Sequence, residues 1–332
     1  MKKILQFAFA ITAASSAFAA QPLLSPADLQ AQAKAPQVRI IDIREPKAYA
    51  ESHIPGAVSA PYGQWRGPAS NPGDLPALPQ LTQLVQSLGL SPDSHAVVVS
   101  SGADTTDFGS AARVYWTLKV LGVQQLSVLN GGMQAWASAK LPQDNVVPPI
   151  TASKFTPTLD KRYIATRDEV AEKVKSGNAL LVDARPAAFF QGETKHAAAK
   201  QAGTLKGAVN VEHSRWFAPG STAMMSVPEA QKAAASTPLG KQPETETVAF
   251  CNTGHWAATN WFAQSEVLGQ KNVKLYAGSM VDWTQDASHL PMDNVPGRMQ
   301  RLQSLFILAA SLSSRRRPVH SGRGVGFLSF PI

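Results

Sequence analysis

The chain has 332 residues, enough for two domains of ordinary size. Its formal net charge of +8 is carried by the two ends, because Lys2, Lys3 and six arginines after residue 297 have no acidic residues around them. The sequence between these two ends has no net charge, which argues against nucleic acid as a partner. A single cysteine, Cys251, excludes a disulfide within the chain.

Residues 1–19 have the pattern of a secretory signal peptide. Lys2 and Lys3 precede an apolar run over 4–14, and the triplet A-F-A at 17–19 matches a cleavage site. The run is too short to span a bilayer permanently. A buried N-terminal helix would explain only the apolar run. We therefore expect a periplasmic or secreted protein with no membrane insertion after cleavage.

The chain then repeats one unit twice. Each copy has a buried strand ending in D-x-R, a turn into a short strand, a second apolar strand, a helical stretch ending in V-L-G, and a glycine turn followed by M-x-x-W. These features lie at 38–44, 53–58, 96–99, 120–122 and 131–136, and again at 179–185, 205–210, 247–250, 267–269 and 278–283. Short apolar strands alternating with helices predict an α/β fold with mainly parallel sheets flanked by helices.

The domain boundaries follow from the repeat. The segment 141–157 contains four prolines, and within it we place the linker at 146–157. The two domains are then predicted at 22–145 and 158–297. The basic segment 298–332 fits neither copy, and we expect a poorly ordered tail that is either solvated or binds an acidic surface.

Cys251 ends the apolar strand 247–250 and begins the loop C-N-T-G-H-W. In such a turn the backbone N–H groups can converge on the sulfur, and the following helix adds partial positive charge, so both favour the thiolate. Gly254 allows the loop to turn tightly. A thiolate is a nucleophile that can carry a second sulfur as a persulfide. The alternative is a cysteine that packs as a small hydrophobe at a strand end.

The first copy serves as an internal control. Ser100 aligns with Cys251, and the loop after it is longer and contains Asp104 and Asp107. These carboxylates would repel an anionic substrate. We therefore expect chemistry only in the second copy.

These motifs resemble the tandem-domain rhodaneses, the thiosulfate and 3-mercaptopyruvate sulfurtransferase family. The resemblance covers residues 22–297 and rests on D-x-R at Asp42 and Asp183, on H-I-P-G-A at His53, on G-A-V-N at Gly207 and on C-N-T-G-H-W-A at Cys251. It implies a catalytically silent first domain and a transfer of sulfane sulfur through a Cys251 persulfide. The donor would be thiosulfate or 3-mercaptopyruvate, and the acceptor cyanide or a thiol. It also implies that no metal or organic cofactor is needed, and we expect a monomer.

Three departures leave the donor open. Thiosulfate-type members have basic residues at the positions of Asn252 and Thr253, and usually a second arginine where this chain has Phe189. Mercaptopyruvate-type members usually have valine where this chain has His255. Four other side chains are candidates for the missing cation: Arg66, Arg215, Lys195 and His196.

The predicted site consists of catalytic Cys251, the loop or substrate-binding residues Asn252, Thr253, Gly254, His255, Trp256 and Arg185, and Asp183 in support. His255 can act as a cation or hydrogen-bond donor toward a bound anion, or as the acid–base partner of the thiolate. Trp256 can wall the pocket or pack against the first domain. For Asp183 and Arg185 we favour a buried ion pair over substrate contact.

Two other functions stay open. A rhodanese-fold phosphatase would use the same cysteine, but its loop is one residue longer and ends in arginine, which this loop lacks. A non-catalytic sulfur carrier or sensor would have a modifiable thiol without turnover. No cysteine–histidine spacing typical of zinc sites occurs.

Overall fold

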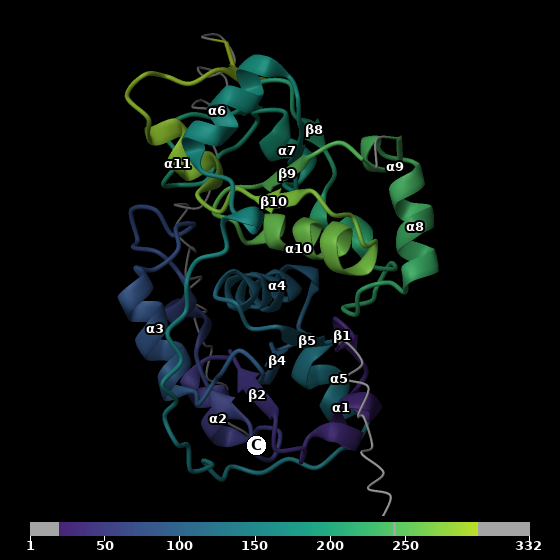
Figure 1. Cartoon of the computed structure of the whole chain (residues 1–332). Helices are drawn as coiled ribbons and strands as arrows, with labels where there is room; N and C mark the ends of the chain where they lie inside the picture. The colour runs from purple at the N-terminus through teal and green to yellow at the C-terminus, as the bar shows by residue number, and fades with distance from the viewer. Residues whose placement is uncertain (1–19, 242–243, 298–332) are drawn as a thin grey trace, which may run out of the picture.

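The computed structural model describes residues 20–241 and 244–297 (Figure 1). The predicted signal peptide and the predicted basic tail lie outside these residues. Within the described ranges, no helix is both long enough and apolar enough to cross a membrane.

The first domain has a five-stranded parallel sheet in the order β1-β5-β4-β2-β3. Its strands are β1 (Leu23–Leu24), β2 (Val38–Asp42), β3 (Val58–Ser59), β4 (His95–Val99) and β5 (Gln125–Leu129). Its helices are α1 (Pro26–Gln32), α2 (Pro46–Glu51), the 3₁₀ turn η1 (Tyr62–Trp65), α3 (Leu78–Ser87), α4 (Thr105–Val120) and α5 (Gly132–Ser138). Parallel neighbours need crossover connections, and the helices supply them.

The second domain has a four-stranded parallel sheet in the order β10-β9-β6-β8 and a separate antiparallel pair, β7 with β11. Its strands are β6 (Leu180–Asp183), β7 (Thr204–Leu205), β8 (Val209–Asn210), β9 (Thr247–Phe250), β10 (Val273–Leu275) and β11 (Met292–Asp293). Its helices are η2 (Lys161–Tyr163), α6 (Arg167–Ser176), α7 (Ala187–Phe190), η3 (His213–Trp216), α8 (Val227–Ala235), α9 (Pro238–Lys241), α10 (Trp256–Phe262), the π-helix η4 (Ala263–Val267) and α11 (Ser279–Gln285). The predicted fold class is confirmed.

Helices α4 and α10 pack against each other between the two sheets (Figure 1). The ring of Phe108 in α4 makes edge contacts with Phe217 and Phe262, and Tyr115 makes another with Phe262. A single buried hydrophobic cluster contains residues of both domains. Because an extensive apolar interface resists relative motion, the second domain is held in a fixed position against the first.

The two D-x-R motifs form equivalent ion pairs. Arg44 Nη2 lies 2.7 Å from Asp42 Oδ2, and Arg185 Nη2 lies 2.6 Å from Asp183 Oδ2. Arg185 also donates to the Gly203 carbonyl at 2.7 Å, and both members of its pair are almost completely buried. The pair therefore ties the end of β6 to the loop that follows, which is the structural role we favoured from the sequence.

Candidate active site

Cys251 lies directly after β9, at the carboxyl end of the sheet, and the loop after it leads into α10. The Ser279 hydroxyl accepts hydrogen bonds from the amides of Cys251, at 3.0 Å, and Gly254, at 3.2 Å, and donates to the Tyr276 carbonyl at 2.8 Å. Ser279 thus fixes both ends of the tight part of the loop. A signal for this residue was present in the repeat, where Ser279 replaces Gly132 of the first copy, and we missed it.

The expected convergence of loop amides on the sulfur is not found: these two amides face Ser279, and no amide of the described residues donates a hydrogen bond to Cys251 Sγ. The amides of Asn252, Thr253 and His255 have no hydrogen-bond acceptor within the described part of the chain. These three donors remain available to an anion bound at the loop. The predicted role of Gly254 is supported by its φ of +68°, and a Cβ there would lie 2.5 Å from the Ala277 carbonyl oxygen.

The Cys251 side chain is buried, with 1% of its surface exposed, and belongs to the hydrophobic cluster shared by the two domains. Its surroundings are not only apolar. Tyr62 and Arg113, both from the first domain, interact with it electrostatically. The cysteine is therefore buried like a structural one but lies in the field of a cation.

Arg113 is a fully buried arginine in the middle of α4. Its Nη2 donates to the carbonyls of Gly73, at 2.8 Å, and Asp74, at 3.3 Å, whereas its Nε and Nη1 have no partner. Nη1 lies beside residues 251–256, the predicted catalytic loop, 2.7 Å from where a Cβ on Gly254 would stand. Burial and then the charge of Arg66 lower the pKa of Arg113 to about 9, so it stays charged at neutral pH.

Sequence reasoning missed Arg113 because it lies in the first domain, which was expected to be silent. The available signal was a lone arginine among the apolar residues of a helix that reads as buried. A buried charge with unsatisfied donors is costly to keep, so its placement beside the catalytic loop points to a role there.

A directed chain of hydrogen bonds joins the catalytic loop to the first domain. Arg66 Nη1 donates to the Tyr62 hydroxyl at 3.0 Å, and the Tyr62 hydroxyl lies 2.9 Å from His255 Nδ1. His255 Nε2 lies 2.7 Å from the Thr106 carbonyl. Because a carbonyl can only accept, Nε2 carries the proton, Nδ1 accepts, and Tyr62 donates.

This chain corrects the interpretation of His255. Burial, and then the charge of Arg66, lower the pKa of His255 to about 4, so the ring is neutral at pH 7 and is not a cation. Both ring nitrogens are occupied, by Tyr62 and by Thr106, so neither is free to take a proton from Cys251. His255 instead docks the loop onto the first domain.

The first two turns of α4 fit closely against this loop. A Cβ on Gly109 would lie 2.9 Å from the His255 ring, so only glycine fits there without a shift. Trp256 Nε1 donates to the Thr106 hydroxyl at 3.3 Å. Contacts from two successive loop residues therefore converge on Thr106.

Trp256 packs against the first domain and also walls the site. Its ring is stacked on His213 at 5.0 Å between centroids and meets Phe189 edge-on at 5.9 Å. Phe189 occupies the position where the resemblance implied a second arginine, and the Arg185 guanidinium lies 5.8 Å from its ring centroid. This side of the site is thus aromatic rather than cationic.

The structure separates the four candidates for the missing cation. Arg66 Nη2 donates to the Thr253 carbonyl at 2.8 Å, so this residue reaches the catalytic loop. Arg215 donates to Ser236 on an exposed surface, and Lys195 donates to the Ala199 carbonyl at 2.6 Å. Burial, and then the charge of Arg66, lower the pKa of His196, which indicates a neutral ring near neutral pH.

The other predicted residues lie together. Arg185 Nη1 is 3.4 Å from Asn252 Oδ1, which links the buried ion pair of Asp183 to the catalytic loop. Within residues 20–241 and 244–297, no group of three or more histidine, cysteine, aspartate or glutamate side chains could hold a metal ion.

Two α/β domains packed through α4 and α10, with one thiol at a strand end of the second, define a tandem-domain protein with a single cysteine-loop site. A family model for the rhodanese-like domain matches residues 25–139 and again residues 166–286. The chain therefore belongs to the rhodanese family.

Individual relatives agree with this assignment. The thiosulfate sulfurtransferase of Azotobacter vinelandii is 34% identical over 268 residues, which cover 80% of this chain and 95% of that protein. The sulfur carrier protein TtuD of Thermus thermophilus is 30% identical over 261 residues, covering 75% and 88%. The fold resembles the crystal structure of SseA from Escherichia coli, described as a 3-mercaptopyruvate sulfotransferase, with a TM-score of 0.67, 23% identity and coverage of 78% of this chain and 98% of that one.

Proposed function

We propose that this protein is a rhodanese-type sulfurtransferase, in which Cys251 takes a sulfane sulfur from a small donor and passes it to a thiophilic acceptor. The observation that carries the proposal is the position of the only thiol, at the start of a loop that Ser279, Arg66 and His255 hold in place. The named sulfurtransferase relative, aligned over nearly its whole length, supports the same activity.

The reaction needs two sulfur–sulfur exchanges. With thiosulfate, the Cys251 thiolate attacks the outer sulfur, a Cys–S bond forms, the S–S bond of thiosulfate breaks, and sulfite leaves with the electron pair. Cyanide then attacks the outer sulfur of the persulfide, so thiocyanate leaves and the thiolate is restored. Neither step needs an external oxidant or reductant, and neither requires a cofactor.

The donor's negative charge is balanced by the first domain in this proposal. Arg66 contacts the catalytic loop from one side, and Arg113 presents two unpartnered nitrogens at Gly254. Phe189 removes the cation that the second domain would otherwise supply. The silent domain therefore contributes the cationic part of the site, and it supplies no nucleophile because Ser100 aligns with Cys251.

A sulfur carrier is the second candidate. The burial of Cys251 and the relative named as a sulfur carrier both favour it. A carrier would hold the same persulfide but would not turn over with small donors and acceptors. A phosphatase is disfavoured because residues 252–256 contain no arginine to bind a phosphate.

The experiment that separates these functions is steady-state thiocyanate formation from cyanide with thiosulfate or with 3-mercaptopyruvate. Multiple turnovers in the wild type and none in Cys251→Ser would support the enzyme. A single stoichiometric burst would support the carrier. We also propose export to the periplasm or beyond on the basis of residues 1–19, which N-terminal sequencing of the protein from its natural compartment would test.

A further inference from the structure

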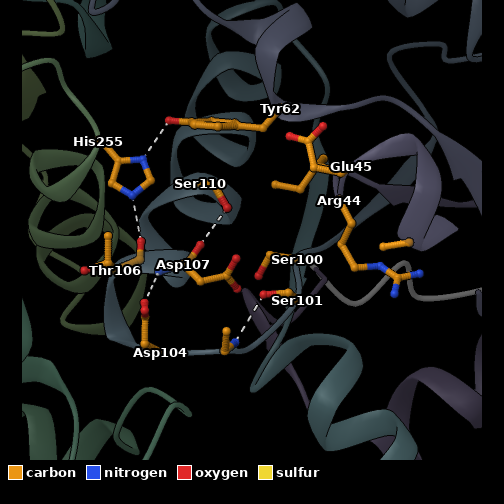
Figure 2. Close-up of a pocket in the computed structure, with 13 residues that line it drawn as sticks. Arg44, Glu45, Tyr62, Ser100, Ser101, Asp104, Thr106, Asp107, Ser110 and His255 are labelled. Atoms are coloured by element: carbon orange, nitrogen blue, oxygen red, sulfur yellow. Dashed lines mark hydrogen bonds between the residues drawn. The ribbon is translucent and has the colours of Figure 1, made fainter. Parts of the chain in front are cut away.

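The first domain contains a cavity of about 480 Å³ (Figure 2). It lies at the position equivalent to that of the catalytic loop in the second domain. Its lining comes from the loops after β2 and β4 and from the first turns of α4, with Tyr62 and His255 on one side. Cavities of this size are typical of sites for small molecules. The family duplication thus leaves a pocket, but not a thiol, in the first copy.

Ser100 gives the cavity an unsatisfied polar group. This residue is 4% exposed and lines the cavity, and its hydroxyl has no hydrogen-bond partner among the described residues. It stands at the position that Cys251 occupies in the second domain. The hydroxyl is therefore open to the cavity and can hydrogen-bond to a molecule bound there.

The protein's own carboxylates occupy two backbone donors that an anion could use. Asp107 Oδ2 accepts from the Gly102 amide at 2.6 Å, and Asp104 Oδ1 accepts from the Asp107 amide at 2.8 Å as the N-cap of α4. Negative charge is therefore already placed at this helix end. An anionic sulfur donor would meet repulsion here, unlike at the loop of Cys251.

The remaining charges favour a cation. Glu45 lines the cavity, and its carboxylate makes no ion pair within the described residues, whereas the nearby Arg44 is neutralised by Asp42. No group of three acidic, histidine or cysteine side chains in those residues could hold a metal ion. The carboxylates among the described residues are thus not arranged as a metal site, and they suit an organic molecule with an ammonium or guanidinium group.

We propose that this cavity binds a small organic cation, held by the carboxylates of Glu45 and Asp104 and by the hydroxyl of Ser100. A ligand that fills the cavity lies against Tyr62 and His255, the two residues that dock the catalytic loop on the first domain.

The test is calorimetric titration of the full protein with 1,4-diaminobutane and with methylguanidine at low ionic strength. The wild type should show saturable binding at one site, and Glu45→Gln and Asp104→Asn should each weaken it by about three- to tenfold. Asparagine is as good an N-cap as aspartate, so the second variant keeps α4 intact. The matched control is Glu51→Gln, which removes an exposed carboxylate of α2 outside the cavity and should leave the affinity unchanged.

No saturable binding of either cation would overturn the proposal, as would an equal loss of affinity in the Glu51→Gln control. Sulfate or acetate binding at the same site as tightly as the cations would also overturn it. The Cys251→Ser variant should bind the cations as the wild type does. Unchanged cation binding by this variant would show that the site is independent of sulfur transfer, because binding in the first domain does not need the thiol.

Discussion

Acidification should destabilise the fold through His255, which docks the catalytic loop in its neutral form. His255 is neutral because Nε2 donates to Thr106 and Nδ1 accepts from Tyr62. Protonation of Nδ1 would turn that acceptor into a donor beside the charge of Arg66. The perturbation is therefore a fall in pH from about 7.5 to about 4.5, over which the unfolded chain takes up a proton on this histidine while most of the folded protein keeps the ring neutral.

The magnitude follows from the pKa of His255, which burial and Arg66 lower from 6.5 to about 4. The unfolded chain binds a proton below pH 6.5, whereas the folded protein does so only below about pH 4. The stabilising contribution is thus complete above pH 6.5 and is lost as the pH falls through this window. Integrated between about pH 7.5 and 4.5, the loss is about 2–3 kcal/mol of unfolding free energy.

The assay is urea denaturation of the wild type and of His255→Gln at both pH values. Glutamine offers an amide donor and a carbonyl acceptor but does not titrate, so the variant should lack this part of the pH dependence. Burial also lowers the pKa of His95 and His213, but both proteins share those groups and the difference cancels them. Equal losses of stability in the two proteins would refute the reasoning about His255.

Two further predictions concern the interface between the domains. Arg113→Met should slow persulfide formation by at least about tenfold. The variant loses the hydrogen bonds from Nη2 to the Gly73 and Asp74 carbonyls, but it also removes a buried charge whose Nε and Nη1 have no partners, so the two effects on unfolding free energy oppose each other. Stopped-flow measurement checks the rate, and an unchanged rate would remove Arg113 from the site. Phe108→Ala should cost about 3–5 kcal/mol in denaturation, because its ring packs against Phe217 and Phe262 across the interface. The control, Val146→Ala in the exposed linker, should change stability by less than about 0.5 kcal/mol.

The fold was accessible from the sequence because its signals are local and occur twice. The strands that end at Asp42 and Asp183 read as apolar runs closed by the same D-x-R motif. Each motif predicts its own ion pair, since aspartate and arginine two residues apart meet at a strand end. Agreement between the copies then excluded chance matches in short segments.

The site was only partly accessible, because most of its surroundings come from the other domain. The sequence places Cys251 and its loop together, but it does not show that Tyr62 and Arg113 lie next to them across nearly 200 and 140 positions of the chain. His255 shows the limit most clearly. Its type predicts a titrating group, and only the contacts with Tyr62 and Thr106 show that it is a neutral docking residue.

The central claim, that Cys251 carries the transferred sulfur, is tested most directly by peptide-level mass spectrometry after brief exposure to thiosulfate. We predict a gain of about 32 Da, one sulfur atom, on the peptide containing Cys251, which cyanide removes. Thiocyanate production with no such gain, or in the Cys251→Ser variant, would contradict the account.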